Sequence, residues 1–183
     1  AESSDAFMSA VIDDRAFRRI KQYIDHAKSG GNCKVITGGT CDDSKGYFVE
    51  PTIVEVNNPD DKIFKEEIFG PVLSVYVYPD PKAEEVLSTV KDSTPYGLTG
   101  AVYSHDKNFV EKARAVLRDA VGNFYINDKS TGSIVGQQPF GGARLSGTND
   151  KAGGPHYMLK WASPLTTKET HVPQHEWAYP YMG

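Results

Sequence analysis

Amphipathic segments alternate with short β-type runs along this chain, and this alternation limits its possible folds more than any other feature of the sequence. The apolar residues of three segments recur at helical spacing, which predicts helices at about Asp14–Ser29, Lys82–Asp92 and Lys107–Ala120. The clearest β-type runs are Lys34–Thr37, Val72–Tyr78, Leu98–Ser104 and Gly122–Asn127. Strands separated by helices of this length indicate an α/β fold, in which βαβ units build a largely parallel sheet.

Three further segments depart from this pattern. Tyr47–Val56 is β-type but contains Pro51, which lacks a backbone donor, so it is predicted to be an edge strand or an extended connector. Residues 128–154 are glycine-rich and aperiodic, which is typical of an ordered functional loop. After Pro155, the alternation of Tyr157 with the residues two and four positions later predicts a strand. We therefore expect a main domain over 1–154 and a C-terminal strand or arm over 155–183.

Composition excludes several classes of function. The 183 residues carry a net charge of −4, and their basic side chains are scattered, so no nucleic-acid partner is expected. No apolar run reaches the ~20 residues of a membrane span. Two cysteines in a chain of this length indicate a reducing compartment. The chain begins without a methionine, as though cut from a larger protein, so the compartment of the parent cannot be read from its N-terminus.

Three motifs occur in a fixed order. Lys65–Val72 reads KEEIFGPV, Tyr96–Gly100 reads YGLTG, and Asn123–Asn127 (NFYIN) is followed by Gln138–Gly142 (QPFGG). In this order and at this separation they resemble the aldehyde dehydrogenase superfamily. A phosphate-cradling GxxxxGK[ST] loop is absent, so a small nucleotide-phosphate enzyme is not favoured.

The resemblance is closest to the branch of this family that oxidises glutamate semialdehyde. Asp128–Arg144, Ser146–Lys151 and Gly153–Tyr157 carry this closer resemblance. It implies that the chain is the C-terminal part of a catalytic domain plus an oligomerisation arm. It also implies that the parent uses NAD, makes glutamate in proline catabolism, works in the mitochondrial matrix and forms a homo-oligomer through the arm.

The resemblance assigns roles to five residues. Glu67, the second Glu of EEIFGP, is expected to hydrogen-bond the ribose of the nicotinamide half of NAD, and Phe69 to pack against that ribose or ring. Gly132 and Ser133 are expected to bind the α-carboxylate of the substrate, since backbone amides in a glycine-containing turn form an anion-binding concavity. Phe140 is expected to wall the aliphatic part of the substrate. Glu67 and the 132–133 bend should face a common cleft.

No catalytic nucleophile is assigned within this chain. Neither Cys33 nor Cys41 has the sequence context of the family's cysteine, and the carboxylates next to Cys41 should raise its thiol pKa. The resemblance places the catalytic cysteine and the Rossmann half upstream, so the chain alone is predicted not to oxidise aldehydes. The alternative is a non-catalytic binding or assembly module. The five histidines show no metal spacing and are expected to be structural or exposed to solvent.

Overall fold

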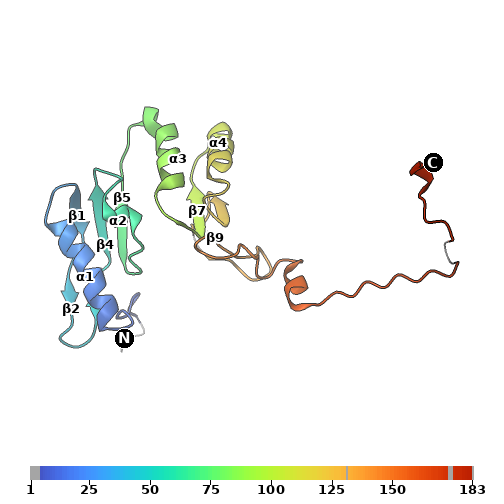
Figure 1. The fold of residues 1–183 in the computed structure, drawn as a ribbon. Helices are drawn as coiled ribbons and strands as arrows, with labels where there is room; N and C mark the ends of the chain where they lie inside the picture. The colour runs from blue at the N-terminus through green and yellow to red at the C-terminus, as the bar shows by residue number, and fades with distance from the viewer. Residues whose placement is uncertain (1–4, 131, 173–174, 183) are drawn as a thin grey trace.

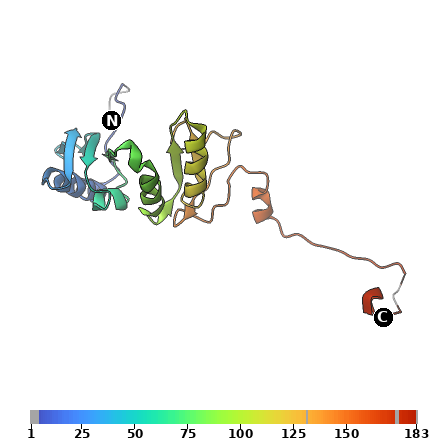
Figure 2. The ribbon, with the colours of Figure 1, turned by 90° about the horizontal axis from the view of Figure 1, so that it is seen from above.

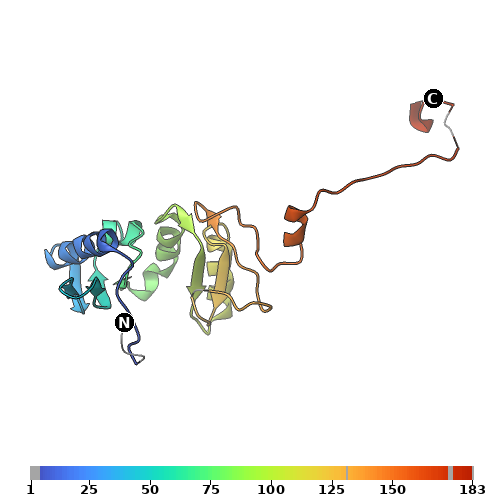
Figure 3. The same cartoon turned by 90° about the horizontal axis from the view of Figure 1, so that it is seen from below.

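The computed structural model describes residues 5–130, 132–172 and 175–182, which form two small lobes and an extended C-terminal tail (Figure 1). Each lobe has its own hydrophobic core. The first lobe, the second lobe and the tail follow one another in space in the same order as in the sequence (Figures 2 and 3). In the part of the chain that the structure describes, no helix is long and apolar enough to cross a membrane.

The first lobe packs one long helix against a three-stranded sheet ordered β1-β4-β5. Its elements are α1 (Asp14–Lys28), β1 (Cys33–Thr37), β2 (Cys41–Asp42), β3 (Phe48–Val49), β4 (Thr52–Val56), α2 (Lys62–Lys65) and β5 (Val72–Val75). Ile20 and Ile24 of α1 and Val54 of β4 are fully buried in this core. The lobe is therefore held mainly by one apolar face of α1.

Local chemistry fixes both ends of α1. The Asp13 carboxylate accepts a hydrogen bond from the amide of Ala16 at 2.7 Å, which satisfies one of the free donors of the first turn. After Ser29 the backbone enters the left-handed region at Gly30 and Gly31, with φ of 87° and 80°. The helix predicted at Asp14–Ser29 is thus confirmed to within one residue.

The second lobe contains η1 and two helices that cover a two-stranded parallel sheet. Its elements are η1 (Asp80–Lys82), α3 (Ala83–Asp92), β6 (Tyr96–Gly97), β7 (Thr99–Val102), α4 (Lys107–Leu117), β8 (Asn123–Ile126) and β9 (Ala143–Arg144). Strands β7 and β8 run parallel with α4 between them, so the predicted βαβ connection is confirmed here. The helices predicted at 82–92 and 107–120 are also confirmed, although α4 ends three residues earlier.

The expected largely parallel sheet is wrong for the described residues. β4 pairs with β5 in parallel, but β1–β4, β2–β3 and β6–β9 are antiparallel, and the strands form four separate small sheets. No helix crosses over between β1 and β4. The chain turns back through the short β2–β3 hairpin instead, which is compatible with antiparallel pairing.

Two strand predictions also fail. The segment 47–56 is not an edge strand, because β4 lies in the middle of its sheet. Pro51 precedes the first residue of β4, so its missing donor never enters the ladder. The strand expected after Pro155 is the 3-10 helix η2 (Tyr157–Trp161), in which the amides of Tyr157 and Leu159 donate to carbonyls three residues back. No described strand pairs with this segment, so local hydrogen bonds replace a ladder.

The described residues beyond η2, 162–172 and 175–182, are exposed and include the short 3-10 helix η3 (Pro180–Met182). They carry large apolar side chains in solvent, among them Leu165, Trp177 and Tyr181. The division into a domain and an oligomerisation arm stays a prediction.

Candidate functional site

The turn between α2 and β5 carries the KEEIFGPV motif, and α1 fixes its position. The Tyr23 hydroxyl donates a hydrogen bond to the Glu66 carboxylate, and this bond raises the pKa of Tyr23. Arg19 Nε donates to the carbonyl oxygen of Ile68 at 3.3 Å. The side chain of Ile68 is buried in the first core. The turn is therefore tied to the helix at Glu66 and at Ile68.

Glu67 lies between these two tied positions and has no such attachment. It is exposed and makes no hydrogen bond or ion pair with any residue that the structure describes. The two adjacent carboxylates are thus separated by role: Glu66 holds the turn, and Glu67 is presented to solvent. The family resemblance had already singled out Glu67, but the physical difference between the two carboxylates depends on Tyr23, which lies more than forty residues earlier.

Phe69 has an unusual backbone conformation. Its φ is 53°, in the left-handed region that residues other than glycine rarely adopt, and its side chain is 77% exposed. The next residue, Gly70, leaves no room for a side chain, because a Cβ there would lie 2.5 Å from Cδ1 of the fully buried Ile20. Gly70 therefore packs closely on α1, while the side chain of the neighbouring Phe69 is exposed to solvent. Strain of this kind is commonest at functional sites.

Glu67 and Phe69 line an open pocket of about 450 Å³. The other lining residues are Ile63, Phe64, Glu66, Ile68, Gly70, Val72 and Ser74. The pocket combines apolar walls with a free carboxylate. Such a surface can take a flat ring against an aromatic side chain while the carboxylate accepts hydrogen bonds from paired hydroxyls.

The second predicted site lies in the glycine-rich loop that follows β8. Gly132 has φ of 74°, and its carbonyl oxygen accepts a hydrogen bond from the hydroxyl of the buried Tyr125 of β8. The amides of Gly132 and Ser133 donate to no described residue. The carbonyl of Gly132 is thus fixed from the core side, and its amide remains available for an acceptor.

Phe140 lies further along the same loop. It forms an isolated antiparallel bridge with Ala152, with N–O distances of 3.0 and 2.9 Å, and its side chain is half-buried. The loop is thus an ordered hairpin-like structure, as the spacing of its apolar residues predicted. Its contact with a substrate stays a prediction.

Lys151 is one of the attachments of this loop, and its role was not predicted from the sequence. Its Nζ donates to the carbonyl oxygens of Gly122 at 2.5 Å and Gly141 at 2.7 Å, and lies 3.4 Å from Oδ1 of Asn123. Burial lowers the pKa of Lys151. The Asn123 amide adds bonds to Pro139 and Gly141. A lysine between Asp150 and Ala152 gives no sequence signal for this role, because its main acceptors are backbone atoms.

The two predicted sites do not share a pocket in this structure. The pocket at Glu67 is lined only by residues 63–74 of the first lobe, whereas Gly132 and Ser133 belong to the second lobe. The expected common cleft is therefore not confirmed and stays a prediction. Each lobe has its own hydrophobic core, so a shared cleft would have to be lined by residues of both lobes.

Neither cysteine is an activated thiol. Cys33 lies in the first core, where burial raises its pKa and the nearby Asp61 adds to the effect. Burial also raises the pKa of Cys41, and Lys21 and Lys28 oppose it only in part. The direction expected for Cys41 is confirmed, but its main cause is burial and not the adjacent carboxylates. A thiol with a raised pKa is a poor nucleophile at neutral pH.

Comparison with known proteins gives consistent matches. A model of the aldehyde dehydrogenase family matches residues 1–166. The mitochondrial delta-1-pyrroline-5-carboxylate dehydrogenase of Homo sapiens is 64% identical over 182 residues, which are 100% of this chain and 32% of that protein. The Danio rerio protein of the same name is 61% identical over 100% of this chain and 33% of its own length.

A solved structure agrees with these relatives. The Delta-pyrroline-5-carboxylate dehydrogenase of Mycobacterium tuberculosis, bound with NAD, superposes with a TM-score of 0.78 at 48% identity. The match covers 95% of this chain and 31% of that one. The chain therefore spans about a third of the length of the relatives it matches.

Proposed function

The chain belongs to the aldehyde dehydrogenase family, and we propose that it is the segment of an NAD-dependent dehydrogenase that binds the nicotinamide ribose and the substrate carboxylate. The free carboxylate of Glu67, beside the exposed Phe69 in an open pocket, is the observation that carries this proposal. The proposed substrate is L-glutamate γ-semialdehyde, which forms from 1-pyrroline-5-carboxylate, and the proposed product is glutamate. The relatives named above support this choice.

The pocket residues fit the nicotinamide end of NAD. Ribose presents neighbouring hydroxyls, and a carboxylate without another partner is their natural acceptor. Because Glu66 is occupied by Tyr23, only Glu67 is available for this role. Phe69 offers an apolar face to the ring or the ribose. When bound, NAD supplies the hydride acceptor, and this chain orients it.

The glycine–serine bend fits the other end of the substrate. An α-carboxylate needs several donors, and the amides of Gly132 and Ser133, together with the Ser133 hydroxyl, can supply them. The Tyr125 hydroxyl keeps the carbonyl of Gly132 turned toward the core, which leaves the amide side of the bend for the anion. Phe140 walls the aliphatic carbons between the carboxylate and the aldehyde.

The nucleophilic thiolate that this chemistry requires is proposed to come from a part of the dehydrogenase outside the sequence described here. Cys33 and Cys41 have raised pKa values, so neither substitutes for it. We further propose that the parent enzyme is mitochondrial and works in the matrix. The exposed apolar tail beyond η2 is proposed to pack on a second copy, which would cover its aromatic side chains.

The cofactor role is tested by titrating the isotope-labelled chain with nicotinamide mononucleotide and following its amide NMR signals. Signals of residues 66–70 are expected to shift, with a Kd on the order of millimolar, because only one end of NAD is bound. Glu67→Gln should abolish the shifts, whereas Glu85→Gln, which changes an exposed carboxylate of α3, should not. Shifts that survive Glu67→Gln would exclude the proposed ribose contact.

The same spectra test the substrate anchor. L-Glutamate should shift the amide signals of Gly132 and Ser133, and its amide analogue L-glutamine, which keeps the α-carboxylate, should do so equally. 4-Aminobutanamide, which is glutamine without its α-carboxylate, should not shift them. An NADH assay with glutamate semialdehyde tests the prediction that the chain alone is inactive, because sustained turnover by the chain would contradict the proposal that the nucleophile lies elsewhere.

A further inference from the structure

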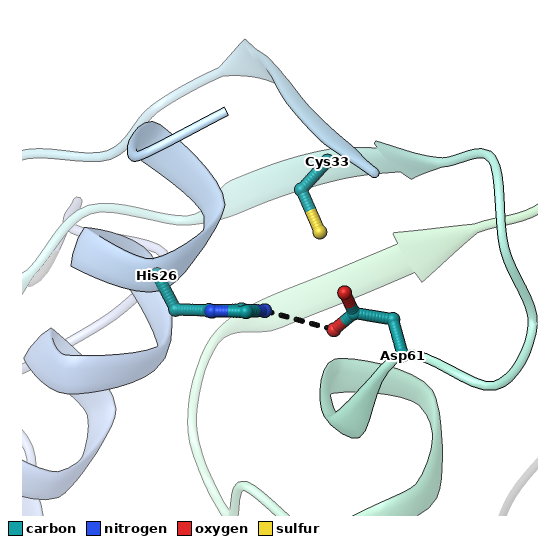
Figure 4. A group of neighbouring side chains, drawn as sticks. All are labelled: His26, Cys33 and Asp61. Atoms are coloured by element: carbon teal, nitrogen blue, oxygen red, sulfur yellow. Dashed lines mark hydrogen bonds and ion pairs between the residues drawn. The ribbon is translucent and has the colours of Figure 1, made fainter. Parts of the chain in front are cut away.

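Three side chains with metal-ligating atoms converge in the first lobe, away from both predicted sites. His26 comes from the last turn of α1, Cys33 begins β1, and Asp61 is the N-cap residue of α2 (Figure 4). Their ligand atoms all lie within 4.8 Å of one another. This cluster was not predicted from the sequence, because only the fold brings His26 and Cys33 next to Asp61, which lies 35 residues after His26.

The cluster is largely enclosed. Cys33 is 7% exposed, the Asp61 side chain 8%, and the His26 side chain 30%. His26 Nε2 lies 2.9 Å from Oδ1 of Asp61, and the same carboxylate caps α2 through the amide of Ile63 at 3.1 Å. The imidazole therefore forms the one open side, through which an ion and a water molecule could enter.

We propose that His26, Cys33 and Asp61 bind a single thiophilic divalent cation of the Zn²⁺ class, with water as the fourth ligand. The donor set is one imidazole nitrogen, one thiolate sulfur and one carboxylate oxygen, a combination that suits Zn²⁺ and not Mg²⁺ or Ca²⁺. Bonds of about 2.0–2.3 Å in a tetrahedral site place the donors roughly 3.3–3.8 Å apart. His26 and Asp61 lie 2.9 Å apart and no pair of ligand atoms is more than 4.8 Å apart, so shifts of about 1 Å bring the donors into this range.

Binding exchanges a proton for the ion. A thiol binds a metal ion as its thiolate, so Cys33 gives up its proton on binding. The cation displaces that proton to solvent as the sulfur–metal bond forms, and no electron is transferred. The hydrogen bond between His26 and Asp61 is replaced by two bonds to the same ion, so no buried donor is left without a partner.

The site would connect three elements of the first lobe. Asp61 starts α2, and α2 leads directly into the turn that presents Glu67 and Phe69. An ion held by α1, β1 and α2 would therefore stabilise the support of this turn without touching the pocket. The proposal does not depend on the dehydrogenase function, because its ligands are outside both predicted sites.

The test is titration of the purified, chelator-treated chain with Co²⁺, followed by displacement with Zn²⁺. A thiolate-to-cobalt charge-transfer band in the near ultraviolet should grow to one equivalent and disappear when Zn²⁺ is added. Cys33→Ser should abolish the band. His26→Gln should weaken metal binding by more than about 100-fold, because loss of a metal ligand costs more affinity than loss of a residue that only hydrogen-bonds a ligand. Cys41→Ser, which removes the other thiol, should leave the band unchanged.

Circular dichroism of each metal-free variant checks folding. Gln at position 26 keeps a hydrogen-bond donor for Asp61 on a partly exposed surface, so this variant is expected to fold even if Cys33→Ser does not. The absence of a charge-transfer band in the wild-type chain overturns the proposal whatever the variants do. A band that persists at full affinity in His26→Gln, or that is lost in Cys41→Ser, also overturns it.

Discussion

Replacement of Lys151 by methionine should release the glycine-rich loop while leaving the first lobe intact. Methionine keeps most of the length of the apolar stem but removes the ammonium group that bonds Gly122 and Gly141 at 2.5 and 2.7 Å. A hydrogen bond from a charged donor contributes about 1.5–3 kcal/mol. The contact with Asn123 at 3.4 Å adds little.

Two effects reduce the sum of these bonds. Burial already opposes the charged form of Lys151, as its lowered pKa shows, and water can reach part of this half-buried site once the ammonium is gone. We therefore expect a net loss of about 2–3 kcal/mol in the free energy of opening the loop. Since ~1.4 kcal/mol corresponds to a factor of ten, amide protection should fall roughly 30- to 150-fold.

Hydrogen–deuterium exchange with mass spectrometry measures this change directly. Peptides from β8 and from residues 139–152 should exchange faster in Lys151→Met, whereas peptides from α1 should not change. Lys129→Met is the matched control, because Lys129 is an exposed lysine of the same loop and should alter protection by less than about threefold. Unchanged exchange in Lys151→Met, or an equal effect in Lys129→Met, would refute the assignment of Lys151 as an attachment of the loop.

Three other perturbations test separate features. Gly122→Ala would place a Cβ 2.0 Å from a backbone carbonyl oxygen of the loop, so the urea midpoint should fall by the equivalent of about 2 kcal/mol or more, and an unchanged midpoint would contradict the close packing. In metal-free protein at pH 7, iodoacetamide should label Cys33 more slowly than Cys41, and both more slowly than free cysteine. The reason is that burial raises the pKa of both thiols. Rapid labelling of Cys33 would argue against its burial. The hydrogen bond to Glu66 raises the pKa of Tyr23 above 10.0, so its contribution to stability is present below pH 10 and lost as pH rises through the higher folded value. Tyr23→Phe should remove this alkaline decline, and an identical decline in both proteins would exclude the bond.

The sequence by itself determined the local elements of the fold. The helices followed from apolar spacing and from capping residues such as Asp13 and Gly30, because these signals act within a few residues of the chain. The order of the EEIFGP, YGLTG and QPFGG motifs was likewise enough to indicate the family, which the matched model confirms over residues 1–166.

Tertiary structure decided how these elements pair and which polar groups are free. The sequence predicted a largely parallel sheet, an edge strand or an extended connector at 47–56, and a strand after Pro155. Each prediction failed because strand pairing depends on partners elsewhere in the chain. The distinction between Glu66 and Glu67 depends on Tyr23, and the role of Lys151 depends on backbone carbonyls. Such contacts leave no pattern in the neighbouring sequence, because a hydrogen bond between distant residues does not depend on the residues next to either of them.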